Sequence, residues 1–232
     1  MSDRESRRAA VMGIGALILG AVPLVGCGSD RRREVVSARP YPKRPVRLAS
    51  AAPYDAPYGS SATTVCAATE PNIEGPYYRP GAPQRADLRP AGAEGTPLEI
   101  AGCIRSLDCR SILGGAVLDV WHADARGRYD NDGHLADMPF LYRGLVAADD
   151  RGEFRIRTIV PGRYLNGRTY RPAHVHVKIT APGHVPLTTQ LYFPGDPFNA
   201  EDPFIRQSLV MDLANENGTQ RGRYEFVLSP KA

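Results

Sequence analysis

Short apolar runs separated by turn-forming dipeptides constrain the fold of this chain most strongly. In residues 152–159, apolar or small side chains alternate with charged ones, which is typical of a strand with one buried face. Comparable runs occupy residues 97–104, 115–122, 173–180, 187–193 and 223–229. Turn signals such as Pro161-Gly162, Pro182-Gly183, Pro194-Gly195 and Asn217-Gly218 separate them. We predict an all-β fold, an antiparallel β-sandwich of immunoglobulin or prealbumin type, with little helix beyond a short one near residues 203–209.

The first 27 residues have the features of an export signal. Arg7 and Arg8 precede an uncharged stretch over residues 9–26, an arrangement typical of a twin-arginine signal. The sequence Leu24-Val-Gly-Cys27 resembles a bacterial lipobox, in which Cys27 would carry the lipid. A transmembrane helix is the alternative, but the stretch is short for a span and contains several glycines and Pro23. We expect an exported protein, periplasmic or anchored to the membrane only through Cys27.

Residues 28–62 are rich in Arg, Ala, Ser and Pro and show no apolar periodicity, which predicts a disordered linker. Residues 63–232 then form the predicted folded domain. The net charge is only +4, and no basic stripe with interleaved aromatic residues occurs, so we expect no nucleic-acid partner.

Three cysteines remain once Cys27 is assigned to the signal. Cys66, Cys103 and Cys109 permit one disulfide and one free thiol, and the sequence leaves all three pairings open. A disulfide agrees with an oxidising compartment.

A pair of histidines marks the predicted site. His174 and His176 stand two residues apart in a predicted strand and so project from the same face, forming half of a metal site. A carboxylate would complete a 2-His-1-carboxylate Fe(II) site. The candidates are Asp124, Asp130, Asp132 and Asp196. A third histidine would favour zinc. The candidates are His122, His134 and His184. The third possibility is tyrosinate from Tyr129 and Tyr164, each of which follows a turn.

Several blocks of sequence carry a specific resemblance. They are residues 114–129, residues 154–176 and residues 187–196, with Glu74-Gly-Pro-Tyr-Tyr78 upstream. In this order they resemble the intradiol ring-cleavage dioxygenases, the family of catechol 1,2- and protocatechuate 3,4-dioxygenases. The resemblance implies a β-sandwich with long active-site loops and a non-haem Fe(III). The implied ligands are Tyr129, Tyr164, His174 and His176.

The resemblance also implies substrates and residue roles. The substrates would be O2 and a catechol-type ring, which is cleaved between its hydroxylated carbons to a cis,cis-muconate-type diacid. Tyr164 would be the axial phenolate that leaves the metal and takes a substrate proton, while Arg171 and Gln190 would act beside the substrate. The chain is most similar to an exported single-domain branch of the family. A homo-oligomer and the identity of the catechol stay open, as does the alternative of an exported, non-catalytic binding module.

Overall fold

The computed structural model describes residues 66–131 and 139–232. The predicted export signal (1–27) and linker (28–62) therefore lie outside the described residues, as do the candidate ligands Asp132 and His134. Within the described ranges, no helix is both long and apolar enough to cross a membrane.

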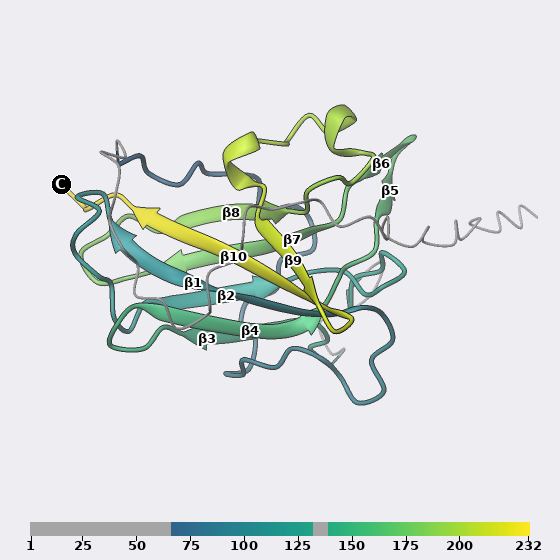
Figure 1. The fold of residues 1–232 in the computed structure, drawn as a ribbon, viewed down its shortest axis with the longest axis horizontal. Coiled ribbons are helices and arrows are strands. Elements are labelled where there is room, and N and C mark those ends of the chain that lie inside the picture. The colour runs from purple at the N-terminus through teal and green to yellow at the C-terminus, as the bar shows by residue number, and fades with distance from the viewer. Residues whose placement is uncertain (1–65, 132–138) are drawn as a thin grey trace, which may run out of the picture. The chain divides into compact units, whose positions relative to one another are not determined.

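Two four-stranded sheets form the domain (Figure 1). The first has the order β4 (Glu153–Ile159), β1 (Pro97–Ser106), β10 (Thr219–Leu228) and β9 (Asp212–Glu216). The second has the order β3 (Arg143–Ala147), β2 (Val117–Trp121), β7 (His174–Thr180) and β8 (Leu187–Tyr192). A separate two-stranded sheet pairs β5 (Tyr164–Asn166) with β6 (Thr169–Arg171). The all-β prediction is confirmed, and every strand pair is antiparallel except β1 with β10, which run parallel.

The alternating side chains of both sheets build one core. Phe154 and Ile156 of β4 enter it, whereas Glu153, Arg155 and Arg157 stay exposed, as the alternation predicts. From the second sheet, Val175, Val177 and Ile179 of β7 are fully buried in the same cluster. Burial of each such aliphatic side chain contributes about 1.5–3 kcal/mol. Because one face of β7 is held in this core, its other face holds the two histidines in a fixed position.

Several elements differ from the sequence prediction. Of the short helix expected near residues 203–209, only a three-residue 3-10 helix forms, η2 (Gln207–Leu209), and a second one, η1 (Asn199–Glu201), precedes this range. Strands β3, β5, β6 and β9 had no predicted counterpart. Strand β10 begins four residues before the predicted one, because it pairs with polar β9 across a tight turn at Asn217 and Gly218, both with positive φ.

Within residues 66–131 and 139–232, one disulfide joins Cys66 to Cys109, with 5.7 Å between their Cα atoms, and Cys103 is free and buried. Of the three pairings that the sequence left open, the structure therefore has Cys66 with Cys109. It ties the segment before the sandwich to the turn after β1, and closing such a loop contributes about 2–4 kcal/mol.

Candidate metal centre

Four side chains predicted as ligands converge at one end of the second sheet. His174 and His176 lie at the start of β7 with ring centroids 4.8 Å apart. The Tyr129 hydroxyl lies 3.5 Å from His174 Nε2. The Tyr164 ring lies 5.7 Å from that of Tyr129 and 5.6 Å from that of His174. The structure therefore brings together two phenol oxygens and two imidazoles that come from three separate segments.

Tyr129 follows a tight loop after β2. The Asp124 carboxylate closes this loop, because its Oδ1 accepts hydrogen bonds from the backbone N–H groups of Arg126 and Arg128 at 2.8 and 2.9 Å. Gly127 has a φ of +78°, and a Cβ at this position would lie 2.1 Å from the carbonyl oxygen of Arg163. Only glycine allows that approach, which packs the Tyr129 loop against the segment that precedes Tyr164.

Tyr77 covers the ring of Tyr129. The two rings are stacked 4.2 Å apart at an interplanar angle of 10°. Tyr129 is 6% exposed. Burial raises the pKa of the Tyr129 phenol well above its usual value.

Tyr164 is the first residue of β5 in the small β5–β6 sheet, where its register partner is Arg171. It is only partly buried, and its ring meets those of Tyr77 and Tyr129 edge to face. Burial also raises the pKa of the Tyr164 phenol.

The imidazoles are held as neutral rings. His174 Nδ1 lies 2.7 Å from the carbonyl oxygen of Pro172, which can only accept, so Nδ1 carries the proton and Nε2 keeps its lone pair. Burial lowers the pKa of His174 to about 3. Burial likewise lowers the pKa of His176, whose ring stacks on Trp121 at 4.8 Å. Neutral imidazole is the form that binds metals.

The other candidate ligands are engaged elsewhere. His122 is buried, but its ring nitrogens contact the Ala123 carbonyl and the Thr158 hydroxyl at 2.7 and 2.6 Å. His184 contacts the Pro182 carbonyl and Ser106. The carboxylates of Asp124, Asp130 and Asp196 pair with arginines. Among the described residues, no group of three or more His, Cys, Asp or Glu side chains could hold a metal.

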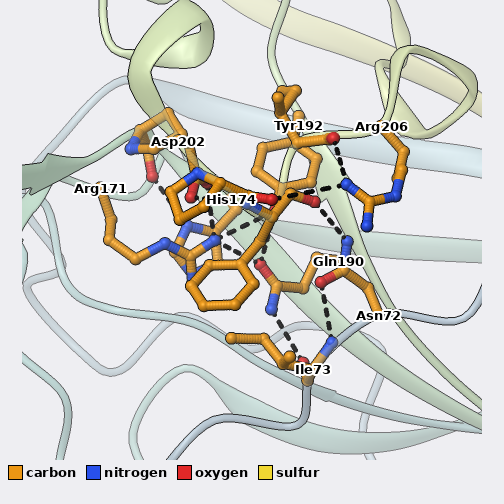
Figure 2. A network of polar contacts seen from close by, with 12 residues as sticks. Asn72, Ile73, Arg171, His174, Gln190, Tyr192, Asp202 and Arg206 are labelled. Carbon is orange, nitrogen blue, oxygen red and sulfur yellow. Dashed lines mark hydrogen bonds and ion pairs between the residues drawn. The ribbon is translucent and has the colours of Figure 1, made fainter.

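Arg171 belongs to a polar network that lies beside His174 (Figure 2). Its Nη2 donates to Gln190 Oε1 at 2.9 Å, Tyr192 Oη at 3.0 Å and Asp202 Oδ2 at 2.8 Å. Its Nε is buried and has no hydrogen-bond partner within the described ranges. Gln190 is fully buried and donates to the carbonyl of Ile73 at 2.8 Å. Both residues predicted to act beside the substrate thus lie inside the protein, and Gln190 is the register partner of His176.

Sequence reasoning missed several contributors to this region. Tyr192 could have been found, because it shares a strand face with Gln190 two residues away. Asp202 gave no local signal, since it reaches Arg171 only through the fold. Tyr77 lies in the Glu74–Tyr78 block that carries the resemblance, but no role was assigned to it. Trp121 is fully buried and stacks on His176.

Comparison with known proteins defines the class. The family model described as Dioxygenase matches residues 73–230. A chlorocatechol 1,2-dioxygenase of Cupriavidus pinatubonensis is 35% identical over 179 residues, which is 69% of each chain. A catechol 1,2-dioxygenase of Acinetobacter baylyi is 32% identical, covering 71% of this chain and 60% of that protein.

Solved structures agree with this class. The dioxygenase domain of a dioxygenase carbohydrate-binding protein fusion from Streptomyces sp. SirexAA-E superposes with a TM-score of 0.61 at 37% identity, over 71% of this chain and all of that one. A 3-chlorocatechol 1,2-dioxygenase of Rhodococcus opacus gives 0.65 at 28% identity, over 70% and 73% of the two chains. The chain belongs to the intradiol ring-cleavage dioxygenase family. It is an oxidoreductase of the dioxygenase class.

Proposed function

We propose that this enzyme uses a non-haem Fe(III) bound by Tyr129, Tyr164, His174 and His176. Its substrates are O2 and a catechol-type ring, which it cleaves between the two hydroxylated carbons to give a cis,cis-muconate-type diacid. The single observation that supports this most is the convergence of two phenols and two neutral imidazoles at one point. Similar proteins are named for chlorocatechol, catechol and hydroxyquinol.

The donor set fits a ferric ion. Burial raises the pKa of both phenols, so each stays protonated unless a strongly charged cation replaces its proton. Phenolate oxygens are hard anionic donors, and the imidazoles are held neutral with His174 Nε2 free to bind. Tyr129, Tyr164, His174 and His176 would hold the Fe(III), which would supply a Lewis acid and one-electron acceptor that makes a catecholate ring reactive toward O2.

Tyr164 is the residue that we assign to proton transfer. It belongs to a peripheral two-stranded sheet and is less buried than Tyr129. Its Oη is therefore the phenolate oxygen with room to move when a diol arrives. The raised pKa of Tyr164 makes this oxygen a good acceptor for a catechol proton.

Arg171 supplies a fixed positive charge beside the reacting ring. Three acceptors occupy its Nη2, which fixes the plane of the guanidinium. Its buried Nε–H, which has no hydrogen-bond partner among the residues that the structure describes, is a donor that can stabilise negative charge on the ring. Gln190 orients the guanidinium through Oε1 and is itself fixed by Ile73.

Oxygen consumption tests the proposal. Iron-loaded protein should consume O2 with catechol, protocatechuate or hydroxyquinol and should be red-brown from tyrosinate-to-Fe(III) charge transfer. A colourless zinc protein would contradict the metal assignment. A coloured protein that consumes no O2 with any of the three would favour the alternative of a non-catalytic binding module.

We propose further that the enzyme is exported and remains periplasmic or lipid-anchored through Cys27. The paired arginines and the Leu24-Val-Gly-Cys27 sequence support this. On this view residues 28–62 are a linker, and residues 63–232 are the catalytic domain. Metabolic labelling with a fatty acid, compared between wild type and Cys27→Ser, tests the anchor, because only the wild type should take up label.

A further inference from the structure

Asp196 is a buried carboxylate in the connection that follows β8. Its carboxylate is 0% exposed. Oδ2 accepts hydrogen bonds from Arg163 Nε at 2.8 Å and from the backbone N–H of Ala173 at 3.1 Å. Oδ1 accepts the backbone N–H of Phe198 at 3.0 Å. One oxygen therefore closes a local turn, while the other binds two segments that are distant in sequence.

Those two segments carry two of the four convergent side chains. Arg163 directly precedes Tyr164, and Ala173 directly precedes His174. Tyr164 belongs to the β5–β6 sheet and His174 to β7, so the main sheet hydrogen bonds do not join them. The Oδ2 atom of Asp196 is a direct link between the residues that flank them.

The Tyr129 loop is tied to the same place. The backbone N–H of Gly162 donates to the carbonyl of Asp124 at 2.8 Å, and Gly127 packs on the carbonyl of Arg163. A displacement of Arg163 is therefore transmitted to the loop that ends at Tyr129. Asp196 thus stands at the junction of three segments that bear phenol and imidazole groups.

A role limited to closing the turn does not account for this arrangement. Turn closure uses only Oδ1 and Phe198, as in an ordinary Asx turn. The charge of the carboxylate acts through Oδ2, where the Arg163 guanidinium provides a charge-assisted bond. A neutral side chain could close the turn but could not hold both Arg163 and Ala173 with a charged oxygen.

We propose that Asp196 is a positioning residue of the metal centre, which sets the spacing between the Tyr164 oxygen and His174 Nε2. This inference rests on the proposed ferric function. Loss of a partner that orients metal ligands typically lowers metal affinity or activity about 10–100-fold. Replacement of Asp196 should therefore lower iron affinity and shift the tyrosinate charge-transfer band. These effects should be separate from any change in folding stability.

The test compares Asp196→Asn with a matched control, Asp149→Asn. Asp149, in the turn between β3 and β4, also accepts two backbone N–H groups, from Arg151 and Glu153, and lies 3.7 Å from Arg151 Nε. Iron affinity is measured on full-length protein by competition with an Fe(III) chelator. The visible charge-transfer band and the thermal midpoint of the metal-free protein are recorded in parallel.

Asp196→Asn should lower iron affinity about 10–100-fold and shift the band, whereas Asp149→Asn should leave both unchanged. If Asp196→Asn does not fold, Arg163→Gln replaces it, since it removes the same charge-assisted bond from a partly exposed position. Wild-type affinity and an unshifted band in the variant would overturn the inference while leaving the proposed function intact. An equal loss of iron in Asp149→Asn would also overturn it. A wild-type protein that binds no Fe(III) would overturn the proposed function, and this inference with it.

Discussion

The two tyrosines of the proposed metal centre sit in contrasting surroundings. Tyr129 ends a tight loop, is nearly buried and lies beneath the stacked ring of Tyr77. Tyr164 begins a three-residue strand outside both large sheets, is partly exposed and meets its aromatic neighbours only edge to face. The two tyrosine side chains thus differ in their freedom to move: Tyr129 is packed rigidly, and Tyr164 is not.

Under the proposed function, this contrast would let one centre keep its metal while one ligand makes room for substrate. A stacked and buried ring has little freedom to rotate, so Tyr129 suits a permanent ligand. A side chain on a small peripheral sheet can move without disturbing the core, so Tyr164 suits a ligand that is displaced. The following predictions test this division, beginning with the largest effect.

Tyr129→Phe should cause the greatest loss. The variant keeps the ring and its packing against Tyr77 but removes the phenolate oxygen that the proposal treats as permanent. We expect iron affinity and O2 consumption each to fall by more than about 100-fold. Loss of a residue that only orients a metal ligand costs at most about that much. Iron content after dialysis and oxygen-electrode rates measure both. A variant that retains iron as tightly as wild type would show that Tyr129 is not a ligand.

Tyr164→Phe should separate metal binding from turnover. Three protein donors remain, so we expect the variant to retain iron with an altered charge-transfer band. Without a proton acceptor at this position, kcat should fall about 10²–10⁴-fold, the usual contribution of a general base. Visible spectra and steady-state kinetics on the same sample provide the test. Wild-type turnover would refute the proton-transfer role and, with it, the division between the two tyrosines.

Asp202→Asn tests the contacts that support the strand paired with Tyr164. Arg171 is the strand partner of Tyr164, and its guanidinium is buried against the fully buried Asp202 carboxylate. Removing that carboxylate leaves a buried cation without its counter-charge, which costs about 3–5 kcal/mol. The free energy of unfolding in urea measures this. Glu216→Gln is the control, because its pair with Arg221 is exposed and should contribute no more than about 1 kcal/mol. Equal destabilisation in the two variants would contradict this account.

Tyr77→Leu should make Tyr129 more like Tyr164. It removes the ring stacked on Tyr129, an interaction worth about 0.5–1.5 kcal/mol beyond the area that it buries. We expect a broadened charge-transfer band and a modest loss of iron affinity, with the proton transfer at Tyr164 unaffected. Spectra and chelator competition measure these quantities. An unchanged band would mean that the stack does not fix the Tyr129 ring.

How far the sequence predicts this molecule depends on whether the signal is local. The strands around Phe154 and Val175 were predictable because one face of each enters the core, which imposes alternation. Strands β5, β6 and β9 were missed because they are short or polar and depend on pairing rather than burial. The parallel contact between β1 and β10 also had no local signal, since it joins the two ends of the domain.

The site shows the same limit. His174 and His176 were predictable from their spacing on one strand. The resemblance to a known family selected Tyr129 and Tyr164 from the alternatives left open and added Arg171 and Gln190. The roles of the carboxylates that support the site, Asp196 and Asp202, were not predicted from the sequence. Asp196 was considered only as a metal ligand, whereas the structure pairs it with Arg163 and Ala173. Asp202 reaches Arg171 from 31 residues away, and no spacing rule connects them.

His184→Ala should have the smallest effect. His184 shares its residue type with the proposed ligands, but its ring nitrogens contact the Pro182 carbonyl and the Ser106 hydroxyl at 2.9 and 3.0 Å. The backbone of His184 forms an isolated β-bridge with Pro230. His184 comes after the last residue of β7, Thr180, whereas His174 and His176 lie at the start of that strand. Loss of these hydrogen bonds should cost about 1 kcal/mol and leave iron content, spectrum and O2 consumption at wild-type values. Loss of the visible band in this variant would mean that an imidazole other than His174 and His176 belongs to the centre, and the fixed and displaceable roles of the two tyrosines would need to be reassigned around it.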